Sequence, residues 1–183
     1  MRKFTVKTIV AIAIGAALFF VLGRFVVIPS PVPNTNVTIQ YGLLAFIAAV
    51  FGPFAGALAG LIGHFLIDLS WGGQIWWSWV LASAVFGCLM GIFSSRLKVD
   101  EGEFGIKGII TFNIAQAISH LLAWVGVAPC LDILFFQEPV DKVFVQGVAG
   151  AIINIIATAI VGTILCFAYS KTIPKEGSLK EEN

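Results

Sequence analysis

Long apolar runs, separated by short polar or Gly- and Pro-containing stretches, occupy almost the whole chain. A helix needs about 20 mainly apolar residues to cross the hydrocarbon core of a membrane. We interpret six runs as spans, at 8–28, 38–51, 54–70, 75–94, 107–128 and 143–168. The second run is short, and only GPF at 52–54 separates it from the third, which predicts a tight helical hairpin. The pattern predicts an all-α integral membrane protein with six transmembrane helices.

The positive charges favour one orientation of these helices, because cytoplasmic loops carry an excess of Lys and Arg. With the N-terminus in the cytoplasm, only Arg24 and Lys142 lie towards the outside. The other basic residues then lie inside: Arg2, Lys3, Lys7, Arg96, Lys98, Lys107, Lys171, Lys175 and Lys180. We therefore expect both termini in the cytoplasm. We also expect a single six-helix membrane domain over 1–170 and a polar cytoplasmic tail over 171–183.

Composition agrees with a membrane protein and argues against several functional classes. Hydrophobic residues make up 58% of the chain and charged residues only 11%, far from the average for soluble domains. The formal net charge is +1, and the basic residues form no stripe that would bind nucleic acid. The chain has no GxxxxGK[ST], GxSxG, HExxH or CxxC motif. We expect no enzymatic activity, no cofactor and no metal site, and any ATP would be bound by a partner.

Two titratable side chains lie four residues apart in the third predicted span. His64 and Asp68 share one helical face, because residues four apart are neighbours on a helix. Asp68 is expected at the outer edge, where its carboxylate could accept a proton from the imidazole and set its tautomer. Ionisable groups inside spans are costly and usually functional, but they also tie helices together. Both interpretations remain open: a contribution to a ligand pocket, or a tie to a neighbouring helix.

A stripe of polar and aromatic residues follows the fifth predicted span. Its spacings of three, four and four place Asn113, Gln116, His120 and Trp124 on one helical face. Asn and Gln in such positions are also ordinary contacts between packed helices. Mostly apolar walls with a few convergent polar groups are typical of a small-molecule pocket. We therefore expect an outward-opening pocket, formed by His64, Asp68, Trp79, Gln116, His120, Trp124 and Gln146.

Several segments together resemble a known family of membrane proteins. Ala13 and Ala17 form an AxxxA face in the first span, and the runs IPSPVPNT, FGPFAGALAGLIGH and WWSWV follow it. With six predicted spans, the chain resembles the substrate-binding S components of energy-coupling factor (ECF) transporters. Within that superfamily it is similar to the UPF0397-like branch grouped with riboflavin-type S components. The resemblance covers residues 5–168.

The resemblance implies a transport function in a bacterial plasma membrane. An S component captures a vitamin or related micronutrient outside the cell and docks on a T subunit driven by two ATP-binding subunits. Carried over to this chain, it implies that Ala13 and Ala17 dock on the T subunit and that Asn34 and Asn36 belong to a lid over the ligand. It also favours pocket roles for side chains on spans four to six, namely Trp79, Gln116, His120, Trp124 and Gln146.

The residues also leave a second function open, from another mechanistic class. In this alternative the chain is a stand-alone carrier of a small molecule, and His64 and Asp68 relay protons across the membrane.

Overall fold

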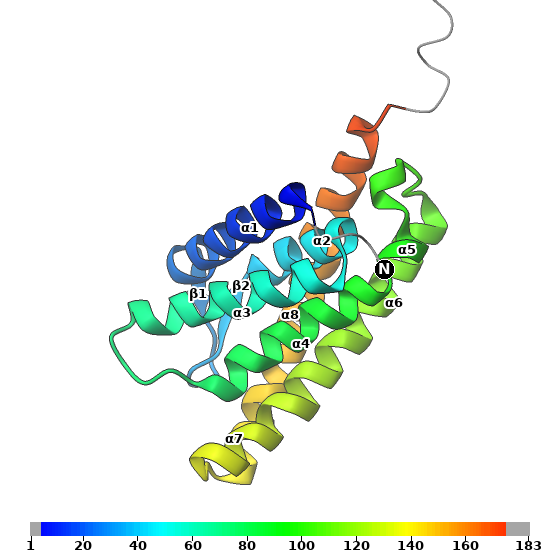
Figure 1. Ribbon diagram of the computed structural model, residues 1–183. Helices are drawn as coiled ribbons and strands as arrows, with labels where there is room; N and C mark the ends of the chain where they lie inside the picture. The colour runs from blue at the N-terminus through cyan, green and yellow to red at the C-terminus, as the bar shows by residue number, and fades with distance from the viewer. Residues whose placement is uncertain (1–4, 175–183) are drawn as a thin grey trace, which may run out of the picture.

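The structure is a computed structural model that describes residues 5–174, and helices dominate it (Figure 1). The elements are α1 (Val6–Phe25), β1 (Val27–Pro29), β2 (Asn36–Thr38), α2 (Gln40–Phe51), α3 (Pro53–Ser70), α4 (Trp77–Ile92), α5 (Ser94–Leu97), the 3-10 turn η1 (Val99–Glu101), α6 (Ile106–His120), the π-helical segment η2 (Leu121–Val127), α7 (Ala128–Phe136) and α8 (Val140–Thr172). Part of the predicted tail, 175–183, lies outside the described residues.

Four helical segments in the described part are long and apolar enough to cross a membrane. They are α1, α3, the continuous segment Ile106–Phe136 and α8. The other two predicted spans correspond to shorter apolar helices, α2 with 12 residues and α4 with 16. The chain is therefore a largely helical protein with several apolar helices of membrane-spanning length. The count of six spans and their orientation stay predictions.

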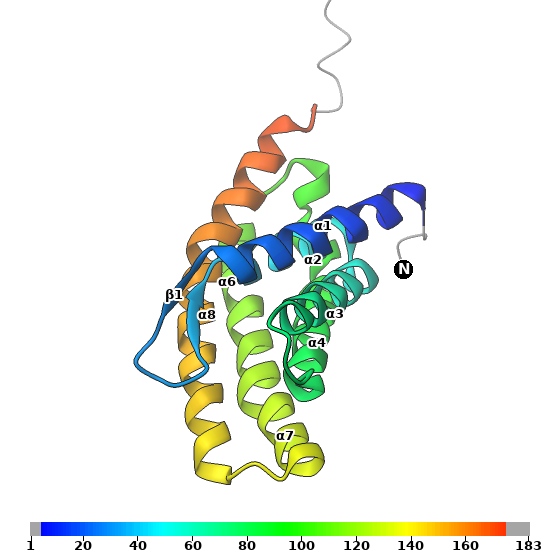
Figure 2. The ribbon, with the colours of Figure 1, turned by 90° about the vertical axis from the view of Figure 1, so that its left-hand side faces the viewer.

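The helices form a fan rather than a parallel bundle. In Figure 2, α1 lies across α6 and α8 instead of running beside them. One end of the molecule holds the β1–β2 hairpin, the loop from α3 to α4, and α7 (Figures 1 and 2). We call it the hairpin end. The start of α1, the α5–η1 connection and the end of α8 lie towards the opposite end, the termini end.

The connection between α4 and α6, at the termini end, is polar. The Lys98 ammonium lies 2.9 Å from a carboxylate oxygen of Glu103 and 3.4 Å from one of Glu101. The hydrogen bond to Glu103 raises the pKa of Lys98 above its ordinary value. A charged, exposed connection of this kind fits a loop in water rather than one in lipid.

The region after α1 differs from the predicted ends of the first and second spans. The first helix ends at Phe25, short of residue 28, and the chain then forms an antiparallel hairpin in which Val27 pairs with Thr38. The second helix consequently begins at Gln40 rather than at residue 38. Helix is disfavoured here because Pro29 ends β1 and the turn that follows contains Pro31 and Pro33. The fold is thus not purely helical.

The hairpin of α2 and α3 follows the prediction closely. Gly52 separates the two helices with φ = 91°, a conformation that side-chain-bearing residues rarely adopt. Pro53 follows as the first residue of α3, where its missing N–H leaves no helical bond unmade.

A second difference concerns the stretch 128–141, which the predicted spans 107–128 and 143–168 leave as a connection between helices. Residues Ala128–Phe136 instead form α7, and the π-helical segment η2 joins it to α6. Pro129 does not break this helix, because the unusual hydrogen bonding of the π-helical segment precedes it and proline is tolerated in a first helical turn. The true loop is therefore short, and α7 brings Asp132 into the packed interior.

Glycines bring α3 and α4 into backbone contact. A Cβ on Gly87 would overlap the carbonyl group of Gly56, and one on Gly60 would lie 2.7 Å from the carbonyl oxygen of Ser83. Small residues at such positions allow membrane helices to approach closely. The repeated glycines of the third predicted span therefore serve internal helix packing.

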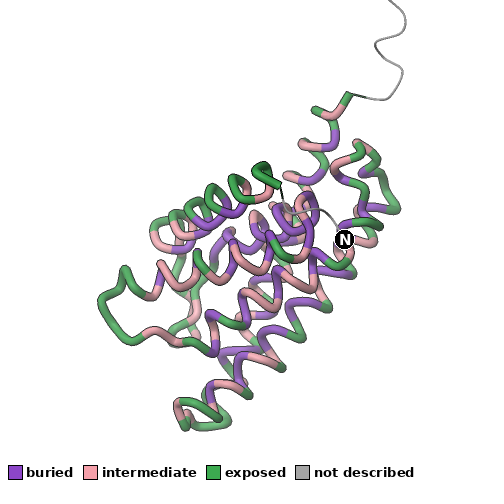
Figure 3. Tube along the Cα trace, in the orientation of Figure 1, coloured by how far each residue is buried: buried purple, intermediate pink, exposed green. Residues whose placement is uncertain are grey.

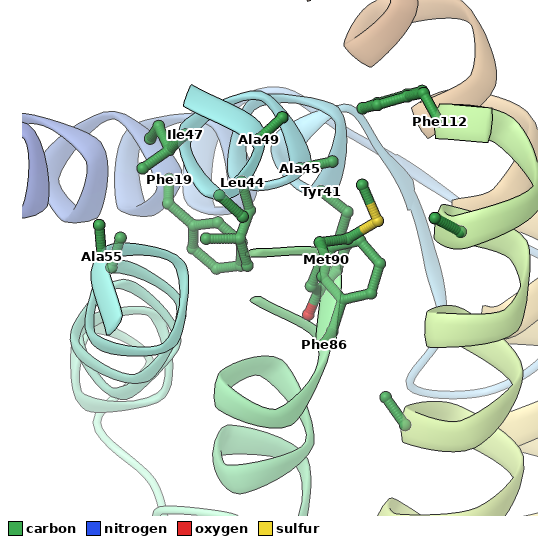
Figure 4. Packing of buried hydrophobic residues seen from close by; sticks show 14 of the residues in the cluster. Phe19, Tyr41, Leu44, Ala45, Ile47, Ala49, Ala55, Phe86, Met90 and Phe112 are labelled. Carbon is green, nitrogen blue, oxygen red and sulfur yellow. The ribbon is translucent and has the colours of Figure 1, made fainter. Parts of the chain in front are cut away.

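The core lies where α2 crosses α3, α4 and α6. Phe19, Tyr41, Leu44 and Phe86 are buried there, and Figure 4 shows the side chains of Tyr41 and Phe86 close together beneath α2. Figure 3 shows α2 mostly buried, whereas α1 is exposed along its outer face. Exposed Ile side chains continue along α6, and exposed Ile and Val side chains along α8, as expected for helices that face lipid.

Candidate functional site

Tyr41, near the start of α2, is the centre of a buried polar and aromatic cluster. Its hydroxyl lies 2.9 Å from Ser83 Oγ on α4. Its ring packs edge-on against His120 and Trp124, with centroids 5.7 and 5.1 Å away. Tyr41 therefore joins α2 and α4 to the predicted stripe. The sequence analysis missed both Tyr41 and Ser83, although a tyrosine within an apolar helix signals a hydroxyl that needs a buried partner.

His64 belongs to the same cluster, but its main partner differs from the predicted one. Its Nδ1 lies 2.6 Å from Ser83 Oγ, whereas Nε2 lies 3.7 Å from Asp68 Oδ1, beyond hydrogen-bond distance. Asp68 Oδ2 accepts the backbone N–H of Trp76 at 2.9 Å. Both side chains thus attach α3 to α4, which agrees with the helix-tie interpretation, and Ser83 rather than Asp68 contacts the imidazole.

His120, at the end of α6, is fully enclosed and makes two directed hydrogen bonds. Trp124 Nε1 donates to its Nδ1 at 2.8 Å, and Nε2 lies 3.1 Å from Thr158 Oγ1 on α8. Since an indole N–H can only donate, Nδ1 must carry a lone pair. In the neutral ring the proton then lies on Nε2 and is donated to Thr158. The ring also stacks on Phe86, with centroids 4.0 Å apart.

The remainder of the α6 stripe contacts α8. Asn113 Nδ2 donates to Thr163 Oγ1 at 3.1 Å, and Gln116 Nε2 donates to the carbonyl of Ile155 at 3.2 Å. The stripe therefore forms the α6–α8 interface. Gln116 Oε1 is nevertheless buried without a hydrogen-bond partner among the described residues. An unsatisfied buried acceptor is costly, so this oxygen is a candidate ligand contact.

Gln146 attaches the β1–β2 hairpin to the helices. Its Nε2 donates to the carbonyl of Pro33 at 3.0 Å, from α8 to the loop between the strands. Asn34 occupies a left-handed turn with φ = 58°, and both Asn34 and Asn36 are exposed. The structure thus places Gln146 against the predicted lid segment, whereas no hydrogen bond among the described residues of this segment joins the two exposed asparagines to the cluster.

Asp132 on α7 is a further buried polar residue that the sequence analysis did not select. Ser78 Oγ donates to Oδ1 at 2.5 Å, and Trp79 Nε1 donates to Oδ2 at 3.1 Å. The Trp79 ring stacks on Trp124, with centroids 5.8 Å apart. Trp79 therefore connects Asp132 to the central cluster. The predicted spans leave Asp132 in the connection between the fifth and sixth helices, where a carboxylate would be solvated.

A separate apolar groove lies between α1 and α2, away from the polar cluster. Its volume is about 370 Å³, and Ala11, Gly15, Leu18 and Phe46 are among its lining residues. Ala13 and Ala17 lie on the exposed part of α1. The first helix thus has two rows of small residues. Ala11 and Gly15 line the groove towards α2, and Ala13 and Ala17 lie on the surface.

The cluster offers hydrogen-bonding groups and packed aromatic rings around Tyr41, and Trp79 connects it to the Asp132 carboxylate. Within residues 5–174 no group of three His, Cys, Asp or Glu side chains is placed to hold a metal ion. Such an arrangement can recognise a flat organic molecule through stacking and hydrogen bonds.

Replacing His120 by alanine is expected to lower the free energy of unfolding by about 1–3 kcal/mol, because the Trp124 N–H would lose its buried acceptor. Thermal unfolding of the purified protein measures the change. Asn36→Ala, at an exposed position, should stay within about 0.5 kcal/mol of the parent. Equal stability of the His120→Ala protein and the parent would show that the histidine is not held by these bonds.

Nearly the whole chain is similar to known proteins. Residues 3–171 match the family model described as "ECF-type riboflavin transporter, S component". The chain is 51% identical over 181 residues to a UPF0397 protein of Staphylococcus aureus strain MSSA476, with 99% of this chain and 98% of the relative covered. A UPF0397 protein of strain Newman is 50% identical over the same coverage.

Proposed function

Because this chain belongs to the ECF-type riboflavin transporter S component family, we propose that it is the substrate-capture subunit of an ATP-driven importer in the bacterial plasma membrane. Its cargo is a vitamin or related micronutrient, bound from the outside. A T subunit and two ATP-binding subunits complete the transporter and supply the ATP hydrolysis. This subunit itself captures and releases the ligand.

The buried cluster around Tyr41 is the observation that carries this proposal. Three predicted pocket residues belong to it. The His120 and Trp124 rings pack against the Tyr41 ring, and the Trp79 ring stacks on Trp124. Aromatic surfaces with a few oriented polar groups fit a flat vitamin-like molecule. Tyr41 lies at the start of α2, directly after the β1–β2 hairpin, and the predicted orientation places the hairpin outside.

The hairpin supports a capture step, because one side-chain hydrogen bond holds it to α8. Gln146 donates to the Pro33 carbonyl. Release of this bond would let the loop between β1 and β2 move away from α8 without breaking a helix. We propose that the loop covers the ligand, with Asn34 and Asn36 on its outer surface.

Docking on the T subunit uses the exposed row of α1. Ala13 and Ala17 present small side chains to the membrane, and small residues let a partner helix approach closely. The groove between α1 and α2 adjoins this helix and offers further apolar surface to the same partner.

Uptake of radiolabelled vitamins by cells that express the chain tests this function. We expect uptake only when the T subunit and both ATP-binding subunits are also present. Uptake that continues without them and stops when the proton gradient is dissipated would contradict the proposal and favour the proton-coupled carrier. An ATP-binding subunit with an inactivated Walker lysine is the matched control, because it keeps the assembly but removes hydrolysis.

A further inference from the structure

Asp132 is a carboxylate buried by uncharged groups. It is 1% exposed, and its two oxygens accept hydrogen bonds from the Ser78 hydroxyl and the Trp79 indole N–H. These donors orient the carboxylate but carry no formal charge. A buried anion without a counter-ion is unfavourable, whereas an anion paired with a cation in the same place is far less so.

The basic side chains near the hairpin end are engaged elsewhere. The Arg24 guanidinium lies over the Trp71 ring, 3.7 Å from its centroid, and Lys142 pairs with Glu138. In the part of the chain that the structure describes, no Lys, Arg or His nitrogen forms an ion pair with Asp132. Asp132 therefore has no counter-ion within residues 5–174.

The carboxylate retains capacity for a further donor. An ionised carboxylate has about four acceptor positions on its two oxygens, and the structure uses one on each oxygen. A ligand N–H or a ring cation could therefore approach Asp132 without displacing Ser78 or Trp79 from their hydrogen bonds.

Aromatic rings surround the same point. Trp79 donates to Asp132 from its ring edge while its face stacks on Trp124 at an interplanar angle of 17°. The Trp76 and Phe136 rings also pack together, with centroids 4.8 Å apart. Indole faces attract cations through their quadrupole, most strongly where water is excluded. A flat cation gains from both the carboxylate and the rings, whereas an anion would be repelled by both.

We propose that the captured ligand is a flat, positively charged heterocycle whose charge is paired with Asp132 and whose ring stacks on the Trp79–Trp124 pair. This inference rests on the proposed function and specifies its substrate class. Asp132 is then the residue that selects for charge, and the tryptophans select for planarity.

A pair of probes that differ by one methyl group and one charge tests the proposal. We would measure binding of the cation 1-methylnicotinamide and of neutral nicotinamide to the purified chain in nanodiscs, by tryptophan fluorescence and calorimetry. We expect the cation to bind about tenfold tighter, the size that a desolvated cation–aromatic contact supports. Asp132→Asn should abolish the preference. Asp141→Asn, which removes an exposed charge near the start of α8, should preserve it.

Three outcomes would overturn the proposal: equal binding of the two probes, tighter binding of nicotinamide, or no binding of either at millimolar concentration. The preference of the parent protein is informative even if Asp132→Asn fails to fold. Riboflavin serves as a neutral flat comparator. If riboflavin binds equally to the parent and to Asp132→Asn while the cation does not bind, the charge proposal fails and the capture function stands. Uptake without the partner subunits would instead remove the capture function.

Discussion

Replacing Gly87 by alanine is expected to destabilise the protein strongly, although it adds only one methyl group. The new Cβ would overlap the backbone of Gly56 on α3. A backbone carbonyl cannot rotate away as a side chain can, so α3 and α4 must separate. Overpacking of this kind costs about 1–3 kcal/mol or more, and the gain of about 1 kcal/mol that alanine brings to a helix offsets only part of it.

Gly150→Ala is the matched control, because a Cβ at that position of α8 meets nothing within 4 Å. It should leave stability unchanged or raise it slightly. Thermal unfolding in detergent measures both variants, and each kcal/mol corresponds to a shift of about 2–4 °C for a chain of this size. Similar melting temperatures for the two variants would refute the close approach of α3 to α4.

Replacing Ala17 by tryptophan is expected to stop uptake while leaving the isolated subunit folded and able to bind ligand. Ala17 is exposed on α1, so the larger side chain meets no neighbour within the chain. An indole on the proposed docking row would hold the partner helix away, and a loss of about 1.4 kcal/mol already weakens association tenfold. Ala13→Trp should behave alike, because it lies one helical turn earlier on the same face.

Ile156→Trp provides the comparison, since Ile156 is also exposed but lies on α8. Co-purification of the T subunit with each variant, together with uptake by whole cells, separates docking from ligand binding. We expect Ile156→Trp to retain both. Normal uptake by the Ala13 and Ala17 variants would exclude α1 from the interface.

The candidate site shows where local patterns stop being informative. The stripe spacing correctly placed Asn113, Gln116 and His120 on one face, and the structure shows that this face meets α8. Asp132 was not selected because it lies between the fifth and sixth predicted spans, where the structure instead has α7 after a π-helical segment that shifts the helical register. Helical periodicity cannot predict side-chain directions beyond such a segment.

The sequence by itself determined the apolar helices, the break at Gly52 and Pro53, the family of the chain, and the residues that share a helical face. These features follow from composition and from contacts within one helical turn. Only the tertiary structure decided the partners: His64 with Ser83, His120 with Thr158, and Asp132 with Ser78. Those partners lie 19, 38 and 54 residues apart. They meet because glycine contacts and helix crossing angles determine how closely the helices approach one another. The periodicity along a single helix does not encode that distance.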